Sequence, residues 1–290
     1  YRFFFQEYSP VGQTKTLPKQ ADTVRLGVVG CSKYTGGFFN VYEALAQQDV
    51  DAVLHLGDYI YEDGAVTKGS KYWPAYDSTG RQHDPPHRLA TRNDYRLRYR
   101  QHHNDTMLQK LRAAHPMIVI WDDHDIFDAD KAVPDADKRQ QLSVETFFEQ
   151  HPIRPDDDRS IIRSFDFGGL VNLMMLDTRV CCRDKAAPKG MTDTTRHIVG
   201  EQQRQWIKEQ VTRSNVPWNV LGNQLLFARK DTDRNRWPGY PADYRPLSHF
   251  MKTSGENFIW LTGNAHNTHH YVIRDTAGQQ VLAHEFLPGS

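Results

Sequence analysis

The chain has 290 residues, of which 38% are hydrophobic and 25% charged, a composition typical of a globular protein rather than a disordered one. Lysine plus arginine total 36, as do aspartate plus glutamate, so nucleic acid and anionic membranes are not favoured as partners. No apolar run reaches the roughly 18 to 20 residues of a transmembrane segment. Because the sequence begins at Tyr1 rather than at methionine, the missing signal peptide says nothing about the compartment.

Six short apolar runs rich in β-branched residues recur along the chain, and each ends in a polar cluster. In chain order they are Val24–Val29, Ala52–Leu56, Met117–Trp121, Leu170–Leu176, Trp218–Leu221 and Phe258–Leu261. Runs of this length bounded by turn residues predict buried strands. Helix-like stretches lie between them, at Phe39–Gln48, Asp94–Ala114 and Glu201–Ser214. Strands that alternate with helices predict an α/β protein with a layered sheet.

The polar clusters after the strands predict one composite active site. In open α/β sheets, ligands bind just beyond the carboxyl ends of the strands. Turn propensity alone can explain any single cluster, but it does not readily explain six with acid, amide, imidazole and thiol groups. Seven of the side chains in these clusters offer metal-ligand atoms. They are Cys31, Asp58, Tyr61, Asp123, Asn223, Asn264 and His266.

This donor set divides into a softer and a harder half. Thiolate and imidazole favour a transition metal, while carboxylate and amide oxygens suit calcium, magnesium or manganese. A carboxylate can bridge two cations, as it does in two-metal hydrolytic sites. The residue types therefore indicate a two-metal centre.

The order of these residues resembles that of the calcineurin-like metallophosphoesterases. Gly57-Asp58 is followed by Tyr61, then by a strand ending in Asp-His, an Asn after a strand, and Gly-x-x-His. The position of this tyrosine, three residues after the aspartate, resembles the motif of the purple acid phosphatases. Longer segments resemble the PhoD (alkaline phosphatase D) family over nearly the whole chain. They are HLGDYIYEDG, DYRLRYR, IVIWDDHD, LDTR, GEQQRQWIKEQ with WNVLGNQLLF, and AHEF.

The resemblance implies two metal sites that share Asp58. The first would hold iron (Fe³⁺), and its ligands would be Cys31, Asp58, Tyr61 and His266. The second would hold calcium (Ca²⁺) or another divalent cation, and its ligands would be Asp58, Asp123, Asn223 and Asn264. Relatives usually carry Asp at the position of Asn264. This chain therefore lacks one negative charge there, which should weaken the binding of a hard divalent cation.

The resemblance also implies the fold and the domains. The expected fold is an α/β calcineurin-like metallophosphoesterase β-sandwich with flanking helices and the metal site at the carboxyl ends of the strands. Residues 1–20 are expected to be the last strand and linker of an N-terminal β-sandwich domain. Residues 21–290 are expected to be the catalytic domain, incomplete at its C-terminal end. A periplasmic or extracellular location follows from the family.

The implied activity is hydrolysis of phosphomonoesters or phosphodiesters by in-line attack of a metal-bound hydroxide. No Ser or Thr stands in a nucleophile-elbow setting, which favours direct attack over a covalent intermediate. His124 is a candidate to steady the phosphoryl oxygens or protonate the leaving oxygen, or else to orient a carboxylate. Arg179 is a candidate phosphate ligand, and a structural pair with Asp177 is equally compatible.

Two other functions stay open. Asn264 is compatible with a secreted binding or assembly protein that keeps a metal site but has weak or no activity. A nucleic-acid enzyme is less favoured because the charge is balanced. The oligomeric state and the substrate are not predicted.

Two paired motifs outside this set have simpler interpretations. His102-His103 follows a run of arginines on an expected helix and is interpreted as surface. Cys181 and Cys182 are neighbours, and a pair of free thiols is favoured over a vicinal disulfide.

Overall fold

The computed structural model describes the whole chain except residues 1, 3, 6, 10, 72, 128–134, 155–159, 185–192, 229–234 and 290. The chain divides into two compact units. Unit 1 comprises residues 1–16 and 25–154, and unit 2 comprises residues 17–24 and 155–290. In the part of the chain that is described, no helix has the length and apolar character needed to cross a membrane.

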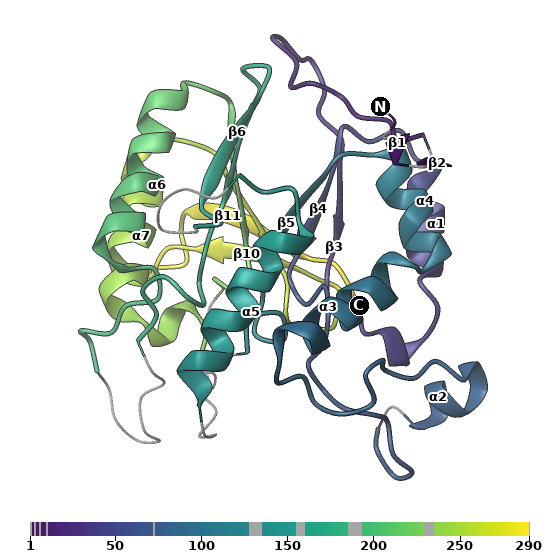
Figure 1. Cartoon of the computed structure of the whole chain (residues 1–290). Helices are drawn as coiled ribbons and strands as arrows, with labels where there is room; N and C mark the ends of the chain where they lie inside the picture. Colours follow the sequence, from purple (N-terminus) through teal and green to yellow (C-terminus); the bar gives the residue numbers. More distant parts are fainter. Residues whose placement is uncertain are drawn as a thin grey trace. The chain divides into compact units, whose positions relative to one another are not determined.

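Unit 1 contains a three-stranded parallel sheet. Its strands are β3 (Leu26–Val29), β4 (Ala52–Leu56) and β5 (Met117–Ile120), with β4 in the centre. Every residue of β4 is buried. This is expected for the central strand of a parallel sheet, whose sequence is almost continuously apolar. Because all three strands run in the same direction, the segments that follow them leave the sheet at one edge (Figure 1).

The helices of unit 1 are η1 (Tyr34–Gly36), α1 (Asn40–Ala46), α2 (Trp73–Thr79), α3 (Arg92–His103), α4 (Thr106–Ala114) and α5 (Ala136–Gln150). Helix α1 contacts α4, and α3 contacts α5 (Figure 1). Two short strands, β1 (Phe4–Phe5) and β2 (Glu7–Tyr8), pair with each other antiparallel.

The helix expected over Asp94–Ala114 is two helices, because Asp105 starts a new one. The Asp105 side chain accepts hydrogen bonds from the backbone amides of Met107 (2.9 Å) and Leu108 (3.1 Å). An aspartate in this N-cap position satisfies amides that an uninterrupted helix would pair with its own carbonyls. The sequence pattern did not reveal the break because the apolar positions continue on both sides of it.

The interpretation of His102 as a surface residue is wrong. Its side chain is fully buried, with Nδ1 3.1 Å from the carbonyl oxygen of Arg98 and Nε2 3.2 Å from that of Ser32. His103, which is partly buried, has its ring 5.8 Å from that of Tyr59. Helix α3 therefore buries both histidines to different degrees. Of the arginines before them, Arg96 and Arg100 are exposed but Arg98 is buried, so the run of arginines does not show that the histidines are exposed.

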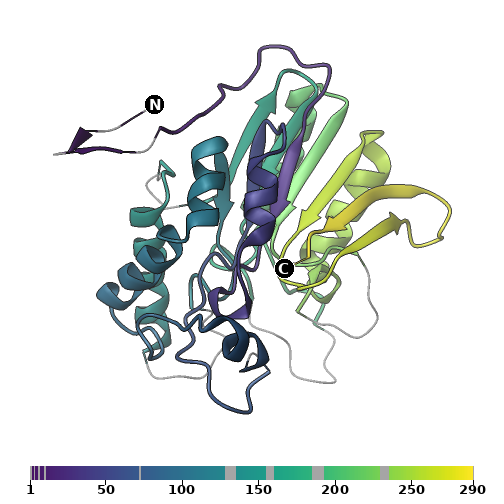
Figure 2. The same cartoon turned by 90° about the vertical axis from the view of Figure 1, so that its right-hand side faces the viewer.

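Unit 2 contains a six-stranded sheet in the order β10-β11-β9-β8-β7-β6. The strands are β6 (Arg163–Phe167), β7 (Val171–Met175), β8 (Trp218–Asn223), β9 (Phe258–Thr262), β10 (His269–Arg274) and β11 (Val281–Leu287). Strands β7, β8, β9 and β11 are parallel, whereas β6 and β10 are antiparallel edge strands. Figure 2 shows β10 and β11 as the yellow hairpin at one edge.

The helices of unit 2 are α6 (Gly200–Ser214), η2 (Trp237–Gly239) and α7 (Pro241–Ser254). Helix α6 contacts β7 and α7, and α7 also contacts β11, so the two helices cover one face of this sheet (Figure 1). The hydrophobic core of this unit contains aliphatic and aromatic side chains, and the ring of Phe227 stacks 4.2 Å from that of Trp260.

Candidate metal centre

Four of the seven predicted ligands have a left-handed backbone. The φ angles are 56° at Cys31, 54° at Asp58, 60° at Asn264 and 52° at His266. Among the described residues, only seven non-glycine residues have positive φ, so more than half of them are predicted ligands. This conformation is unfavourable for residues with a Cβ, and such strain concentrates at functional sites. The backbone therefore supports the choice of these positions independently of the side chains.

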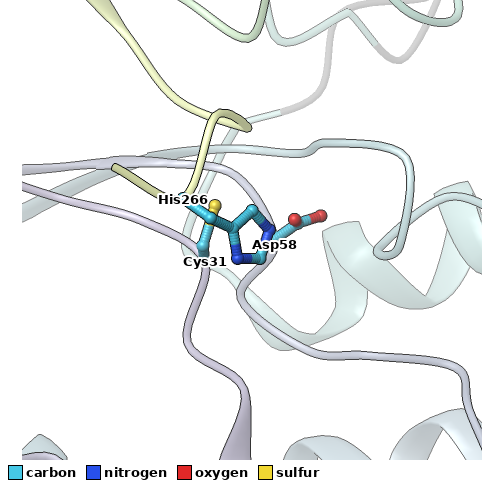
Figure 3. Close-up of side chains that lie close together, drawn as sticks. All are labelled: Cys31, Asp58 and His266. Atoms are coloured by element: carbon cyan, nitrogen blue, oxygen red, sulfur yellow. The ribbon is translucent and has the colours of Figure 1, made fainter. Parts of the chain in front are cut away.

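In unit 1, Asp58 is the residue around which the other candidates gather. Its side chain is completely buried. One ligand atom of Asp58 lies within 4.8 Å of the Cys31 sulfur, and one lies within the same distance of ligand atoms of both Asp123 and His124. Figure 3 shows Cys31 and Asp58, which come from the turns after β3 and β4. Asp58 thus belongs to both groups, as a bridging carboxylate must.

Tyr61 completes this cluster from the turn after β4. Its hydroxyl donates a hydrogen bond to Oδ2 of Asp58 (3.2 Å), and its side chain is buried. The ring centroid lies 4.3 Å from that of His124 and 4.3 Å from Nζ of Lys33. Arg98 donates hydrogen bonds to the carbonyl oxygens of Tyr61 and Asp63, which fixes the segment that carries the phenol.

The turns after β4 and β5 are joined by Asp125. Its carboxylate accepts hydrogen bonds from the backbone amides of Ile60 (2.9 Å) and Asp122 (2.9 Å). Burial, together with the charge of Asp58, raises the pKa of Asp125. Gly57 permits the close approach of the two turns, because a Cβ there would lie 2.4 Å from the Cβ of Asp122. These contacts hold Asp58 and Asp123 next to one another.

His124 is held by a buried carboxylate that the sequence did not single out. Its Nδ1 lies 2.6 Å from Oε2 of Glu62, and Glu62 also accepts a hydrogen bond from Arg88 (2.8 Å). Burial lowers the pKa of His124, but the Glu62 hydrogen bond and the charges of Asp58 and Asp123 outweigh burial and raise it to about 9. A protonated imidazole beside these carboxylates can donate a proton or a hydrogen bond to an anionic ligand.

In unit 2, Asn223 lies at the end of β8 in a hydrogen-bonded network. Its Oδ1 accepts hydrogen bonds from the backbone amide of Leu225 (3.1 Å) and from Nε1 of Trp237 (3.0 Å). Its Nδ2 donates to Oγ1 of Thr262 (2.8 Å). Two donors therefore already occupy the amide oxygen that a cation would use.

The turn after β9 carries Asn264 and His266, which is labelled in Figure 3. This turn is tied to the end of β8, because the backbone amide of Gly263 donates to the carbonyl oxygen of Asn223 (3.0 Å). Both residues thus follow the carboxyl ends of the parallel strands in unit 2, as the sequence predicts.

Arg179 lies in the turn after β7 and is buried. The carboxylate of Asp177 accepts hydrogen bonds from the backbone amides of Arg179 (2.8 Å), Val180 (2.9 Å) and Cys181 (3.1 Å). The preference for free thiols at Cys181 and Cys182 is wrong, since the two are joined in a vicinal disulfide.

Comparison with known proteins shows the family of this chain. Residues 26–290 match the family model of PhoD-like phosphatases. This chain belongs to the PhoD-like phosphatase family. It is 32% identical over 302 residues to alkaline phosphatase D of Bacillus subtilis (strain 168), an alignment that covers 92% of this chain and 50% of that protein. The chain therefore spans about half the length of this relative.

Solved structures give the same family and the fold. A structure of PhoD superposes with a TM-score of 0.86 and 30% identity, covering 98% of this chain and 60% of that one. A purple acid phosphatase from yellow lupin seeds has a TM-score of 0.62 and 14% identity, covering 97% of this chain and 47% of that one, which shows the fold alone. The predicted mixed α/β fold of the metallophosphoesterase type is confirmed, while the sandwich packing of the sheets stays a prediction.

For a PhoD-like protein, the residues of unit 1 fit a metal centre. A buried carboxylate is costly unless a cation or several hydrogen-bond donors compensate it, and Asp58 lies among further acidic groups. Sequence reasoning missed Glu62 and Arg98, although both lie in segments that resemble the family, HLGDYIYEDG and DYRLRYR. Nothing in their local pattern distinguishes a buried supporting charge from an exposed one.

Proposed function

We propose that this chain is the catalytic part of a metal-dependent phosphoesterase that hydrolyses phosphate esters. The observation that carries the proposal is the arrangement around Asp58 in unit 1, whose carboxylate lies within 4.8 Å of the Cys31 sulfur and of ligand atoms of Asp123 and His124. Family membership supports the same reaction class. We further propose that the protein acts outside the cytoplasm, in keeping with the family resemblance.

In this proposal, Asp58 is shared by two cations. Cys31, Tyr61 and His266 would complete a softer site suited to iron. Asp123, Asn223 and Asn264 would complete a harder site suited to calcium or another divalent cation. When bound, the cations make a water molecule more acidic and offset the charge of the phosphoryl oxygens. The left-handed backbone at Cys31, Asp58, Asn264 and His266 supports this assignment.

The protein's own side chains would orient the ester and move protons. His124, held by Glu62 at 2.6 Å, would hydrogen-bond a phosphoryl oxygen or protonate the leaving oxygen. Arg179 would bind phosphate with the two parallel N–H groups of its guanidinium. We propose direct attack of water, because no serine or threonine is placed as an activated nucleophile. A phosphorylated residue trapped during turnover would contradict this.

Asn223 is the least supported of the ligands. Its amide oxygen accepts hydrogen bonds from Leu225 and Trp237, so metal binding requires it to share or exchange one of them. A binding protein without activity is the less favoured alternative, because the buried carboxylate, phenol and thiol of unit 1 are all retained.

The test is metal analysis of the purified protein combined with assays on a chromogenic phosphodiester and the matching monoester. We expect bound iron and a divalent cation, hydrolysis of at least one ester, and loss of hydrolysis after chelation. Readdition of the two metals should restore the rate. Undiminished hydrolysis by exhaustively demetallated protein would exclude the proposal, as would absence of hydrolysis with both metals bound.

A further inference from the structure

Glu285 is a fully buried carboxylate in the middle of unit 2. It lies on β11, and its oxygens accept hydrogen bonds from the backbone amides of Phe227 (2.8 Å) and Ala228 (2.7 Å). A third bond comes from Oγ1 of Thr262 (2.6 Å). Three donors compensate a charge that burial alone would make costly. The carboxylate therefore joins the segment after β8 to the last residue of β9.

Thr262 links Glu285 to Asn223 through a second hydrogen bond. Because the Thr262 hydroxyl donates its hydrogen to Glu285, its oxygen is left to accept from Nδ2 of Asn223 (2.8 Å). The amide is thereby fixed in one orientation, with Oδ1 toward the donors on Leu225 and Trp237. This buried chain of hydrogen bonds runs from β11 through β9 and β8 to η2.

We infer that Glu285 is a positioning residue for the candidate metal centre, acting through Thr262 on the turns that carry Asn223 and Asn264. Glu285 binds the backbone amides of Phe227 and Ala228 directly, and Asn223 binds that of Leu225. Glu285 also binds the side chain of Thr262, from which the turn with Asn264 begins. The catalytic part of the inference rests on the proposed function, whereas the ordering of the two turns does not.

The variants Thr262→Val and Thr262→Ser separate positioning from packing. Valine keeps the shape of threonine but removes both hydrogen bonds, while serine keeps the hydroxyl. The control is Asn172→Ala, which removes hydrogen bonds to Asn219 (3.1 Å) and to the carbonyl oxygen of Gln210 (3.3 Å) near the amino ends of β7 and β8. All three variants should fold, and urea unfolding measures how much each is destabilised.

Two readouts decide the inference. The first is hydrogen exchange of the backbone amides in residues 223–228 and 263–266. The second is the calcium concentration for half-maximal hydrolysis, with kcat and KM measured separately. For Thr262→Val we expect faster exchange in both segments, a calcium requirement raised about tenfold, and a lower kcat with little change in KM. Thr262→Ser should stay within about twofold of the parent, and Asn172→Ala should alter neither readout.

The inference is wrong if Thr262→Val changes only overall stability, as the control does, or if serine behaves like valine. Absence of metal-dependent hydrolysis in the parent would instead contradict the proposed function. In that case the exchange measurement still decides whether the Thr262 hydroxyl, which links Glu285 to Asn223, orders the two turns.

Discussion

The charge around Asp58 depends on a small number of individual side chains. Asp58 is buried beside Asp123 and His124, and Asp125 lies in the same pair of turns. At position 264, the chain has a neutral amide where the family resemblance leads us to expect a carboxylate. Single substitutions that change charge without changing shape therefore test the centre most directly.

Asp58→Asn should be the most damaging single change, because in the proposed centre this carboxylate would serve both cations. We expect kcat to fall by far more than tenfold, which corresponds to more than about 1.4 kcal/mol of transition-state stabilisation. The metal-free variant should be at least as stable as the parent, since it removes a buried charge. Asp63→Asn, which alters a half-exposed carboxylate paired with Lys33, is the control and should keep most of the activity. A loss below tenfold would mean that Asp58 is not shared.

Asn264→Asp should tighten binding of the harder cation. Two unit charges about 4 Å apart interact by about 4 kcal/mol at an effective dielectric constant near 20. Desolvation of the new carboxylate offsets much of this, so we expect roughly tenfold tighter binding, about 1.4 kcal/mol. Asn264→Leu should empty the harder site and leave iron bound. Identical metal stoichiometry and affinity in both variants would place Asn264 outside the coordination shell.

At the scale of whole elements, six of the described strands were predictable from the sequence, whereas β6, β10 and β11 were not. The β-branched runs give β3, β4, β5, β7, β8 and β9 to within a few residues, because buried parallel strands are almost purely apolar. Helices α5 and α7 were not predicted. The first has many polar residues, and the second contains Pro246 within it, so neither shows a clear helical pattern.

The proposed ligands stand out in the sequence because each lies at or just after the end of a strand, whereas the buried residues that support them do not stand out. Glu62 and Glu285 look like ordinary acidic residues in the sequence, and only the fold shows that both are buried. Their partners are far away in the chain, for example Phe227 for Glu285. Local patterns cannot predict contacts of this kind.

The carboxylate of Asp243 on α7 caps the amino end of α6, and this contact predicts how strongly the two helices depend on each other. Asp243 accepts hydrogen bonds from the backbone amides of Ile198 (2.8 Å), Val199 (2.9 Å) and Gly200 (2.9 Å), and it also pairs with Arg204 (2.6 Å).

Asp243→Ala should therefore lower the free energy of unfolding by about 3 to 5 kcal/mol, because it leaves three amides and a buried guanidinium without this partner. Glu201→Gln, which alters the exposed partner of Arg204, should cost less than about 1 kcal/mol. Urea unfolding of both variants checks the prediction. Equal effects would mean that the capping role of Asp243 contributes little.

For the whole molecule, buried histidines in unit 1 should determine how stability falls in acid. Burial lowers the pKa of His55 to about 3, that of His83 to about 2 and that of His102 to about 4, from 6.5 in each case. Below pH 6.5 the unfolded chain binds protons that the folded protein excludes. Each histidine therefore contributes stability that is complete above about pH 6.5 and is lost as the pH falls toward its folded value.

Replacing one of these histidines should make the free energy of unfolding fall less steeply as the pH is lowered. For His55→Leu, the free energy of unfolding should fall less steeply than in the parent between pH 6.5 and 4, by up to about 1.4 kcal/mol per pH unit. His87→Gln is the control, because the side chain of His87 is 62% exposed. Urea unfolding at a series of pH values gives both slopes. Parallel slopes for the parent and His55→Leu would show that His55 is already protonated in the folded protein.

The left-handed backbone at Cys31, Asp58, Asn264 and His266 has a consequence for protein engineering. Glycine adopts this conformation without strain, so glycine at any of these positions would relieve about 1 kcal/mol or more of backbone energy. A directed-evolution screen that rewards heat resistance alone would therefore favour glycine where the proposed ligands now stand. Mutant libraries made to raise the melting temperature of this protein should therefore keep these four residues unchanged. Otherwise we expect the selected variants to be more heat-resistant but to lack the proposed activity.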